Sequence, residues 1–134
     1  MESVRQVAAL PVRRNADGSL NVLLVTSRET RRWVIPKGWP WPDREDHLAA
    51  AEEAREEAGV LGLALSGSIG SYTYCKRHPD GPIPVRVHVY LLEVCEELVS
   101  WPERDQRDRA WFELSDAATK VDEPELRDLL LQVR

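Results

Sequence analysis

The chain has 134 residues, of which 43% are hydrophobic and 31% charged, and its formal net charge is −5. This length and composition are ordinary for a globular protein with one core, so we expect a single domain over residues 1–134. No apolar run approaches the roughly 18 residues that a membrane span requires. The acidic balance also argues against a general nucleic-acid-binding surface, although a cation and a few basic side chains can still hold an anionic substrate.

Two strands joined by a turn are predicted at the start of the chain. Residues 4–13 and 20–28 are rich in β-branched and aliphatic residues, and the turn-forming residues 15–18 lie between them. A short strand is expected at 33–35. The segment 39–44 contains two prolines, which exclude the interior of a helix there.

A helix is predicted over residues 46–58. Asp46 is a suitable N-cap, and Gly59 stands at the C-terminal cap position. Small residues recur every four positions and form a smooth stripe, which would let the helix lie close to a sheet. These residues are Ala50, Ala54 and Ala58.

The second half of the chain alternates strands and short helices. Strands are expected at 68–77, 84–94 and 109–114, with Ser115 as the cap of a short helical turn. A final helix should start near Asp122 and bury apolar residues at amphipathic spacing, namely Leu126, Leu129, Leu130 and Val133. The pattern as a whole predicts one mixed α/β domain.

The first residues and the two cysteines both favour a cytosolic protein. Residues 1–6 lack the basic stretch and apolar core of a signal peptide. Cys75 and Cys95 lie inside strand-like runs without a CxxC or paired-histidine spacing, so we expect buried free thiols rather than a disulfide or a metal site.

Three glutamates on the predicted helix are the most informative feature of the sequence. Glu53, Glu56 and Glu57 stand at i, i+3 and i+4, so their carboxylates project from one face. Like charges at this spacing cost about 0.2–0.5 kcal/mol per pair, and the C-terminal end of the helix dipole disfavours anions further. A cluster of oxygen ligands suits Mg²⁺ or Mn²⁺ and suits zinc poorly. The competing interpretation is a solvated acidic face, which is common on surface helices.

The strand at 33–35, Pro36-Lys37-Gly38, a loop, and the segment from Glu53 to Val60 together resemble a Nudix box. Gly38 and the terminal Glu-Glu-Ala-Gly-Val fall at the spacing of that family. The resemblance implies an α/β/α sandwich with a mixed, partly curled central sheet and the Nudix helix packed on it. It also implies a magnesium-dependent hydrolase, with Mn²⁺ as an alternative ion.

A looser resemblance extends over most of the chain. Residues 33–38, 87–94, the loop around Trp101 and residues 109–112 look like the branch that hydrolyses diphosphoinositol polyphosphates and diadenosine polyphosphates. The implied reaction is cleavage of a phosphoanhydride in a nucleoside diphosphate linked to another moiety, or in a diphosphoinositol polyphosphate. The alternatives are a nucleoside triphosphate or RNA 5′-end pyrophosphohydrolase, and a non-catalytic nucleotide sensor. Family habit would also allow a homodimer.

Two positions depart from the family pattern. Arg44 stands where the family has the first glutamate of the box, and Glu52 stands where it has an arginine. In the family these two residues commonly pair and hold the catalytic loop on the helix. With the charges exchanged, an Arg44–Glu52 ion pair could do the same, or both residues could simply be solvated.

The resemblance also assigns roles. The implied metal ligands are Glu53, Glu56, Glu57 and the backbone carbonyl of Gly38. The general base is either a glutamate of the box or one from a later segment, and the candidates are Glu53, Glu96, Glu97 and Glu103.

Several basic and aromatic residues are candidates for substrate binding. Lys37 is favoured for phosphate because it is next to Gly38, and the other candidates are Arg28, Arg31, Arg32, Lys76, Arg77 and Arg86. Arg86 and His88 share a strand face and could line the cleft together. Trp39 and Trp41 could stack on a base or could pack the proline-rich loop.

Overall fold

Strand β1 (Val4–Arg14) lies at the centre of the computed structural model, which describes residues 4–133. The seven-stranded sheet has the order β3-β2-β1-β6-β5, with β4 paired to β1 and β7 paired to β2. The β1–β6 pair is parallel and the other pairs are antiparallel, so the sheet is mixed. The other strands are β2 (Leu20–Thr26), β3 (Trp33–Val34), β4 (Lys37–Gly38), β5 (Val60–Lys76), β6 (Ile83–Glu97) and β7 (Arg109–Glu113).

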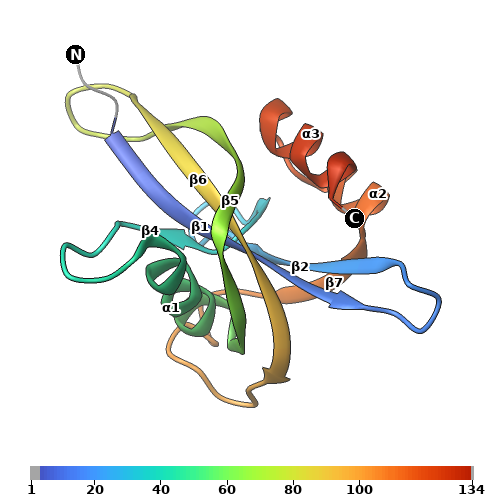
Figure 1. The fold of residues 1–134 in the computed structure, drawn as a ribbon. Helices are drawn as coiled ribbons and strands as arrows, with labels where there is room; N and C mark the ends of the chain where they lie inside the picture. The colour runs from blue at the N-terminus through green and yellow to red at the C-terminus, as the bar shows by residue number, and fades with distance from the viewer. Residues whose placement is uncertain (1–3, 134) are drawn as a thin grey trace.

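Three helices complete an α/β/α arrangement. Helix α1 (Asp46–Ala58) covers one face of the sheet, and α2 (Leu114–Lys120) and α3 (Pro124–Gln132) lie on the other side (Figure 1). Among the described residues, no helix is long and apolar enough to cross a membrane.

Side chains of β1 point alternately into the two hydrophobic cores, one on each face of the sheet. Val7 and Ala9 pack in the core beneath α1, whereas Ala8 and Leu10 pack in the core beneath α2 and α3. Successive residues of a strand point to opposite faces, so a strand covered on both sides must be apolar throughout. This explains the continuous apolar runs of β1 and β2.

Helix α1 lies close to the sheet because its inner face is made of alanines. Ala50, Ala54 and Ala58 are each exposed by 1% or less. Gly59 ends the helix in the left-handed conformation, with φ of 66° and its N–H bonded to helix carbonyls. The predicted cap at the other end was wrong. The N-cap is Glu45, and the Asp46 carboxylate instead accepts a hydrogen bond of 2.5 Å from Arg5 of β1.

Several boundaries differ from the expectation. Strand β5 begins at Val60, whereas the predicted strand began at residue 68. The sequence around Gly62 has weak strand signals, but this first half of β5 still pairs with β6, with shifts in register. Ser115 is not a cap, since α2 starts at Leu114. Helix α3 starts at Pro124, whose fixed φ suits the first helical turn.

The two cysteines are also not where the sequence predicted them. Cys75 and Cys95 are free, as expected, but both are exposed. Cys75 lies near the end of β5 and Cys95 near the end of β6, where each strand extends beyond the region that the helices cover.

Candidate active site

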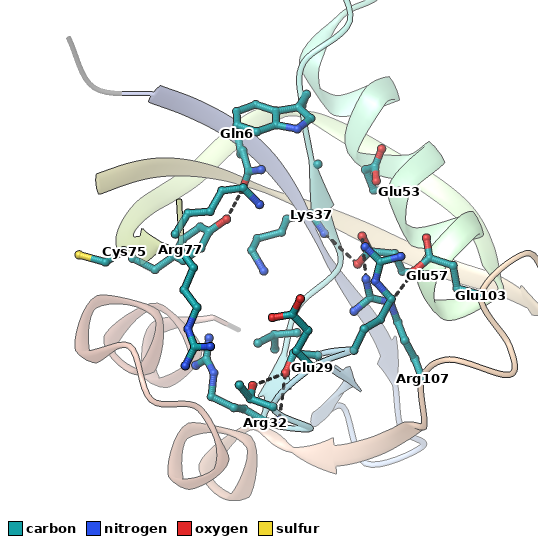
Figure 2. Close-up of a pocket in the computed structure, with 18 residues that line it drawn as sticks. Gln6, Glu29, Arg32, Lys37, Glu53, Glu57, Cys75, Arg77, Glu103 and Arg107 are labelled. Atoms are coloured by element: carbon teal, nitrogen blue, oxygen red, sulfur yellow. Dashed lines mark hydrogen bonds and ion pairs between the residues drawn. The ribbon is translucent and has the colours of Figure 1, made fainter. Parts of the chain in front are cut away.

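A cleft of about 880 Å³ opens at one edge of the sheet, between α1 and the loop after β2. It collects residues from segments that are far apart in the chain: β1, the 27–32 loop, β4, α1, the end of β5, and the 98–108 loop. Figure 2 shows three glutamates on one side of this cleft, with Lys37 between them and Arg77.

The acidic wall of the cleft consists of Glu53, Glu57 and Glu103. Glu53 and Glu57 are separated by one turn of α1 and therefore project side by side. Glu57 is only 7% exposed, and its Oε1 accepts a 3.3 Å hydrogen bond from the backbone N–H of Lys37. Glu103 comes from the 98–108 loop, so the wall joins two parts of the chain that are distant in sequence.

Gly38 leaves room for the Glu53 carboxylate. A Cβ atom at this position would overlap all three atoms of that carboxyl group. Any other residue would therefore displace Glu53 or shift β4. This is a steric requirement for glycine at the edge of the acidic wall.

Two carboxyl groups of the acidic wall, those of Glu53 and Glu57, have raised pKa values. Burial, followed by repulsion from Glu57, Glu56 and other carboxylates, raises the pKa of Glu53 to about 7. Burial raises the pKa of Glu57 to about 7 as well, against the opposing effect of the positive charges on Arg107 and Lys37. The wall is thus short of positive charge, and a cation would relieve it.

Arg107 supplies part of the missing positive charge. Its side chain is 10% exposed and donates from Nε to Glu103 Oε1 at 2.7 Å and from Nη1 to the carbonyl of Thr26 at 3.1 Å. Its Nη2 lies 3.6 Å from Glu57 Oε2. Arg107 therefore links both glutamates to the end of β2.

The 98–108 loop is fastened to the C-terminal end of α1. Arg109 donates hydrogen bonds to the carbonyls of Ala58 and Gly59, at 2.9 and 3.0 Å, and stacks on Trp101 at 3.9 Å from the ring centroid. The Glu103 N–H donates to the carbonyl of Glu56 at 3.0 Å. These bonds satisfy helix carbonyls that would otherwise lack partners, and they hold Glu103 beside Glu57.

Basic side chains line the rest of the cleft. They come from the 27–32 loop, β4 and the end of β5, and they are Arg28, Arg32, Lys37, Lys76 and Arg77. Arg32 lies 3.2 Å from Glu123 and 3.3 Å from Asp122, in the segment that leads into α3. The acidic and basic walls face each other across one cavity.

Lys37 lies at the floor of the cleft, between the two walls. Its Nζ is 4.9 Å from the centroid of the Tyr74 ring, and the Tyr74 hydroxyl donates to Gln6 Oε1 at 2.7 Å. Burial lowers the pKa of Lys37, although Glu57 and Glu123 raise it. Glu123 is 8% exposed, and its Oε1 is buried without a hydrogen-bond partner among residues 4–133.

The acidic wall fits a hard divalent cation in its donor chemistry. Glu53 and Glu57 offer carboxylate oxygens that repel one another, next to a backbone that a glycine leaves accessible. In the part of the chain that the structure describes, however, no group of three or more acidic, histidine or cysteine side chains converges as a complete metal cage. Glu57 is turned toward Arg107.

Comparisons with known proteins agree with this geometry. A family model described as the NUDIX domain matches residues 4–133. Nudix hydrolase 16, mitochondrial, from Arabidopsis thaliana is 35% identical over 117 residues, which cover 84% of this chain and 64% of the relative. The chain belongs to the Nudix family. Diphosphoinositol polyphosphate phosphohydrolase 3-beta from Bos taurus is 38% identical over 99 residues, covering 72% of this chain and 57% of the relative.

Solved Nudix structures share the fold. An Ap4A hydrolase from C. elegans, in a binary complex, superposes with a TM-score of 0.69 at 24% identity, covering 96% of this chain and 93% of that one. A NUDIX hydrolase from Nitrosomonas europaea gives a TM-score of 0.73 at 18% identity, covering 97% and 87%. The chain spans only 64% and 57% of the length of the two curated relatives named above.

The Nudix helix α1 brings two of its three predicted ligands into the cleft. Glu53 and Glu57 line it together with Gly38. Glu56 does not line it, and its Oε1 lies 3.7 Å from Arg55 on the outer side of the helix. The role of Glu56 as a metal ligand stays a prediction.

The exchanged box residues do not pair with each other. Glu52 is bound by Arg55, one turn later on the same helix, with Arg55 Nε 2.9 Å from Glu52 Oε1. Arg44 lies over the Trp41 ring, 4.3 Å from its centroid. Of the two alternatives for these positions, the Arg44–Glu52 ion pair is not formed. Arg55 is instead the partner of Glu52, and a contact within one helix does not order the loop.

Other predicted residues also lie away from the cleft. Arg86 contacts Ser71 at 3.1 Å and Glu125 at 3.5 Å, and the idea that it lines the cleft with His88 was wrong. Arg31 pairs with Asp108 at 2.7 Å. Of the candidate general bases outside the box, Glu97 accepts from Trp111 and Glu96 is exposed near the end of β6, so Glu103 alone reaches the cleft.

Arg107, Gln6 and Tyr74 are site residues that the sequence did not reveal. Their positions in the cleft result from pairing between strands and from the docked loop, and they carry no local motif. The one usable signal was the Glu103–Arg107 spacing, which is common in surface loops.

Proposed function

We propose that this protein hydrolyses a phosphoanhydride with the help of a divalent cation, Mg²⁺ or Mn²⁺. The substrate class is a nucleoside diphosphate linked to another moiety or a diphosphoinositol polyphosphate, as in the relatives named for such substrates. One observation carries the proposal: a wall of carboxylates, in which Glu53 and Glu57 have raised pKa values, faces a wall of lysine and arginine within one cleft. Such a cleft has a place for a cation and a place for phosphates.

The acidic wall would hold the cation through Glu53, Glu57 and the Gly38 carbonyl, with Glu56 joining if its side chain leaves Arg55. A bound divalent cation neutralises phosphate oxygens and activates water. The chain itself must keep these carboxylates close together, which one turn of α1 and the Gly38 contact accomplish.

Glu103 is the general base of this proposal. It lies in the cleft, it is not part of the box, and Arg107 fixes one of its carboxylate oxygens. The other oxygen is then free to accept the proton of the attacking water. Arg107 would hold Glu103 in the orientation that this transfer needs.

The basic wall would hold the phosphates. Lys37 is closest to the acidic wall and is the first candidate for the scissile group, whereas Arg32, Lys76 and Arg77 are placed for further phosphates. One guanidinium group can donate two parallel hydrogen bonds to two oxygens of a phosphate. This geometry orients the chain of phosphates as well as attracting it.

The test is product release from a panel of anhydrides in the presence of Mg²⁺. The panel contains diadenosine polyphosphates, diphosphoinositol polyphosphates, nucleoside triphosphates, ADP-ribose and 5′-triphosphorylated RNA. We expect turnover of one of the first two classes. The value of kcat should fall about 10²- to 10⁴-fold in Glu103→Gln, and turnover should be lost in Glu57→Gln. Glu97→Gln is the matched control, since Glu97 lies outside the cleft.

The same assay decides between an enzyme and a sensor. A non-catalytic nucleotide sensor is favoured by one observation: the three box glutamates do not converge in the described residues. Binding of a panel member with Mg²⁺ but without turnover would establish the sensor and overturn the hydrolase. Turnover of only triphosphates or RNA would keep the enzyme and change its substrate. Cytosolic location and dimerisation stay predictions.

A further inference from the structure

Trp39 occupies an unusual position at the mouth of the cleft. It follows Gly38 directly, it lines the cleft, and it is 49% exposed. Trp41, two residues later, is also partly exposed at 37%, but it lies outside the cleft lining and its ring is covered by Arg44. The half-exposed indole offers flat apolar surface that a ligand in the cleft could cover.

The surroundings of Trp39 are suited to a nucleotide. Lys76 Nζ lies over the indole ring at 6.0 Å from its centroid, farther away than Arg44 lies from the Trp41 ring at 4.3 Å. Gln6, which is 4% exposed, lines the same cleft, and its Oε1 is already used by Tyr74. The amide –NH₂ of Gln6 therefore remains as a donor on the inner side.

The chain places this surface next to the phosphate-binding residues. Gly38 separates Lys37 from Trp39, and consecutive Cα atoms are about 3.8 Å apart. A ligand with phosphates at Lys37 and an aromatic ring at Trp39 would need a short spacer between these two parts, such as the ribose of a nucleoside diphosphate. An inositol ring carries hydroxyl and phosphate groups and offers no aromatic face.

We propose that Trp39 is the stacking platform for the base of the substrate, and that it makes the cleft select phosphoanhydrides that contain a nucleobase over those built on inositol. This inference rests on the proposed function for the location of the phosphates. A base stacked on an aromatic side chain contributes about 1–3 kcal/mol in nucleic-acid-binding proteins, a contribution that depends little on which base is bound. The platform would thus recognise nucleosides as a class.

The experiment compares two ligands and three variants. The dissociation constants of ADP and of inositol hexakisphosphate are measured by titration calorimetry with Mg²⁺. Trp39→Leu keeps an apolar side chain without a flat ring, and Trp39→Phe keeps the ring. Trp41→Leu is the control outside the cleft. We expect ADP to bind about five- to tenfold more weakly to Trp39→Leu, with less than threefold change in Trp39→Phe. Inositol hexakisphosphate should change less than twofold throughout.

The platform is overturned if Trp39→Leu binds ADP as the wild type does. It is also overturned if Trp39→Leu and Trp39→Phe weaken ADP binding equally. The same holds if Trp39→Leu weakens the binding of ADP and of inositol hexakisphosphate to the same extent, because either result indicates a role in the shape of the cleft. Thermal unfolding of each variant confirms that the fold is retained.

Turnover separates this inference from the proposed function. With a diadenosine polyphosphate, Trp39→Leu should raise KM about five- to tenfold, by the same loss of stacking, and change kcat much less. If the wild type hydrolyses no member of the panel, the proposed function fails, while the ADP titration still decides the platform. If turnover is normal and KM does not change in Trp39→Leu, the enzyme stands and the platform fails.

Discussion

The two walls of the cleft are built in different ways. The acidic wall is rigid: Glu53 and Glu57 lie on one regular helix, and hydrogen bonds from Arg109 and Glu103 fasten the 98–108 loop to the end of that helix. The basic wall is assembled from three separate segments, and most of its long side chains are exposed. Under the proposed function, the carboxylates would be held on one helix and its docked loop, whereas phosphate binding would be shared among three segments.

The walls also differ in their electrostatic balance. The acidic wall is under-compensated, since Glu53 and Glu57 both have pKa values of about 7. The basic wall is partly neutralised at rest, because Arg32 is paired with Asp122 and Glu123. We therefore expect variants in the acidic wall to change the affinity for the divalent cation and kcat. Variants in the basic wall should change KM.

The largest effect is expected at Gly38. Gly38→Ala places a methyl group where the Glu53 carboxylate lies, and should weaken Mn²⁺ binding about 10- to 100-fold by displacing a ligand. Gly67→Ala is the matched control, since a Cβ there meets nothing within 4 Å. The measurement is a Mn²⁺ titration followed by electron paramagnetic resonance. Equal Mn²⁺ affinity in the two variants would show that the Gly38–Glu53 contact does not shape the metal site.

The next effect concerns the link between the helix and the docked loop. Arg107→Gln leaves Glu57 and Glu103 without their cation and removes a bond to Thr26, so the free energy of unfolding should fall by about 2 kcal/mol. Arg31→Gln removes an exposed pair with Asp108 and should cost less than about 0.5 kcal/mol. Urea unfolding of both variants checks this. A loss for Arg107→Gln no larger than for Arg31→Gln would mean that the link is not a stabilising one.

A smaller effect is expected in the pH dependence of stability. The pKa of Glu53 is raised in the folded state, so its ionised form destabilises the fold; the penalty is absent below the unfolded pKa near 4.5 and complete above about pH 7. Because Glu53 is partly exposed, we expect Glu53→Gln to stabilise the metal-free protein by about 1 kcal/mol at pH 8, roughly 3 °C in Tm.

The stabilisation by Glu53→Gln should vanish near pH 4.5, where the wild-type carboxyl is protonated in the fold. Thermal melts in the presence of a chelator at both pH values provide the measurement. An equal gain at the two pH values would contradict an ionisable origin and would indicate better packing or hydrogen bonding of the glutamine.

The smallest effect is expected in the basic wall. Arg77→Gln removes one of several cations around the phosphates and should raise KM about threefold, with kcat nearly unchanged, as for an exposed ion pair. Arg86→Gln changes a residue that does not line the cleft and should leave both constants unchanged. Steady-state kinetics at two salt concentrations test the pair, since added salt should reduce the effect of Arg77→Gln. A fall in kcat instead would place Arg77 among the groups that act on the reaction itself.

Features that depend on local spacing could be predicted from the amino-acid order alone. The side-by-side placement of Glu53 and Glu57, the alanine stripe of α1 and the left-handed cap at Gly59 all follow from 3.6 residues per turn and from the conformational freedom of glycine. The α/β class and most strands followed from apolar runs and turn residues. The resemblance to the Nudix box then located the family, which the comparisons confirm.

Which residues share the cleft depends on contacts between segments that are distant in the chain. Glu103 and Glu97 are equally good candidates for the general base by sequence. Of the two, only Glu103 reaches the cleft beside Glu57, because the 98–108 loop folds back on the end of α1. Arg107 meets Thr26 across 81 positions of the chain. Trp39 and Trp41 are equal candidates for stacking on a base by sequence, but in the structure Arg44 covers the ring of Trp41. Local spacing sets directions along one element, whereas such partners are set by the packing of elements that are distant in sequence.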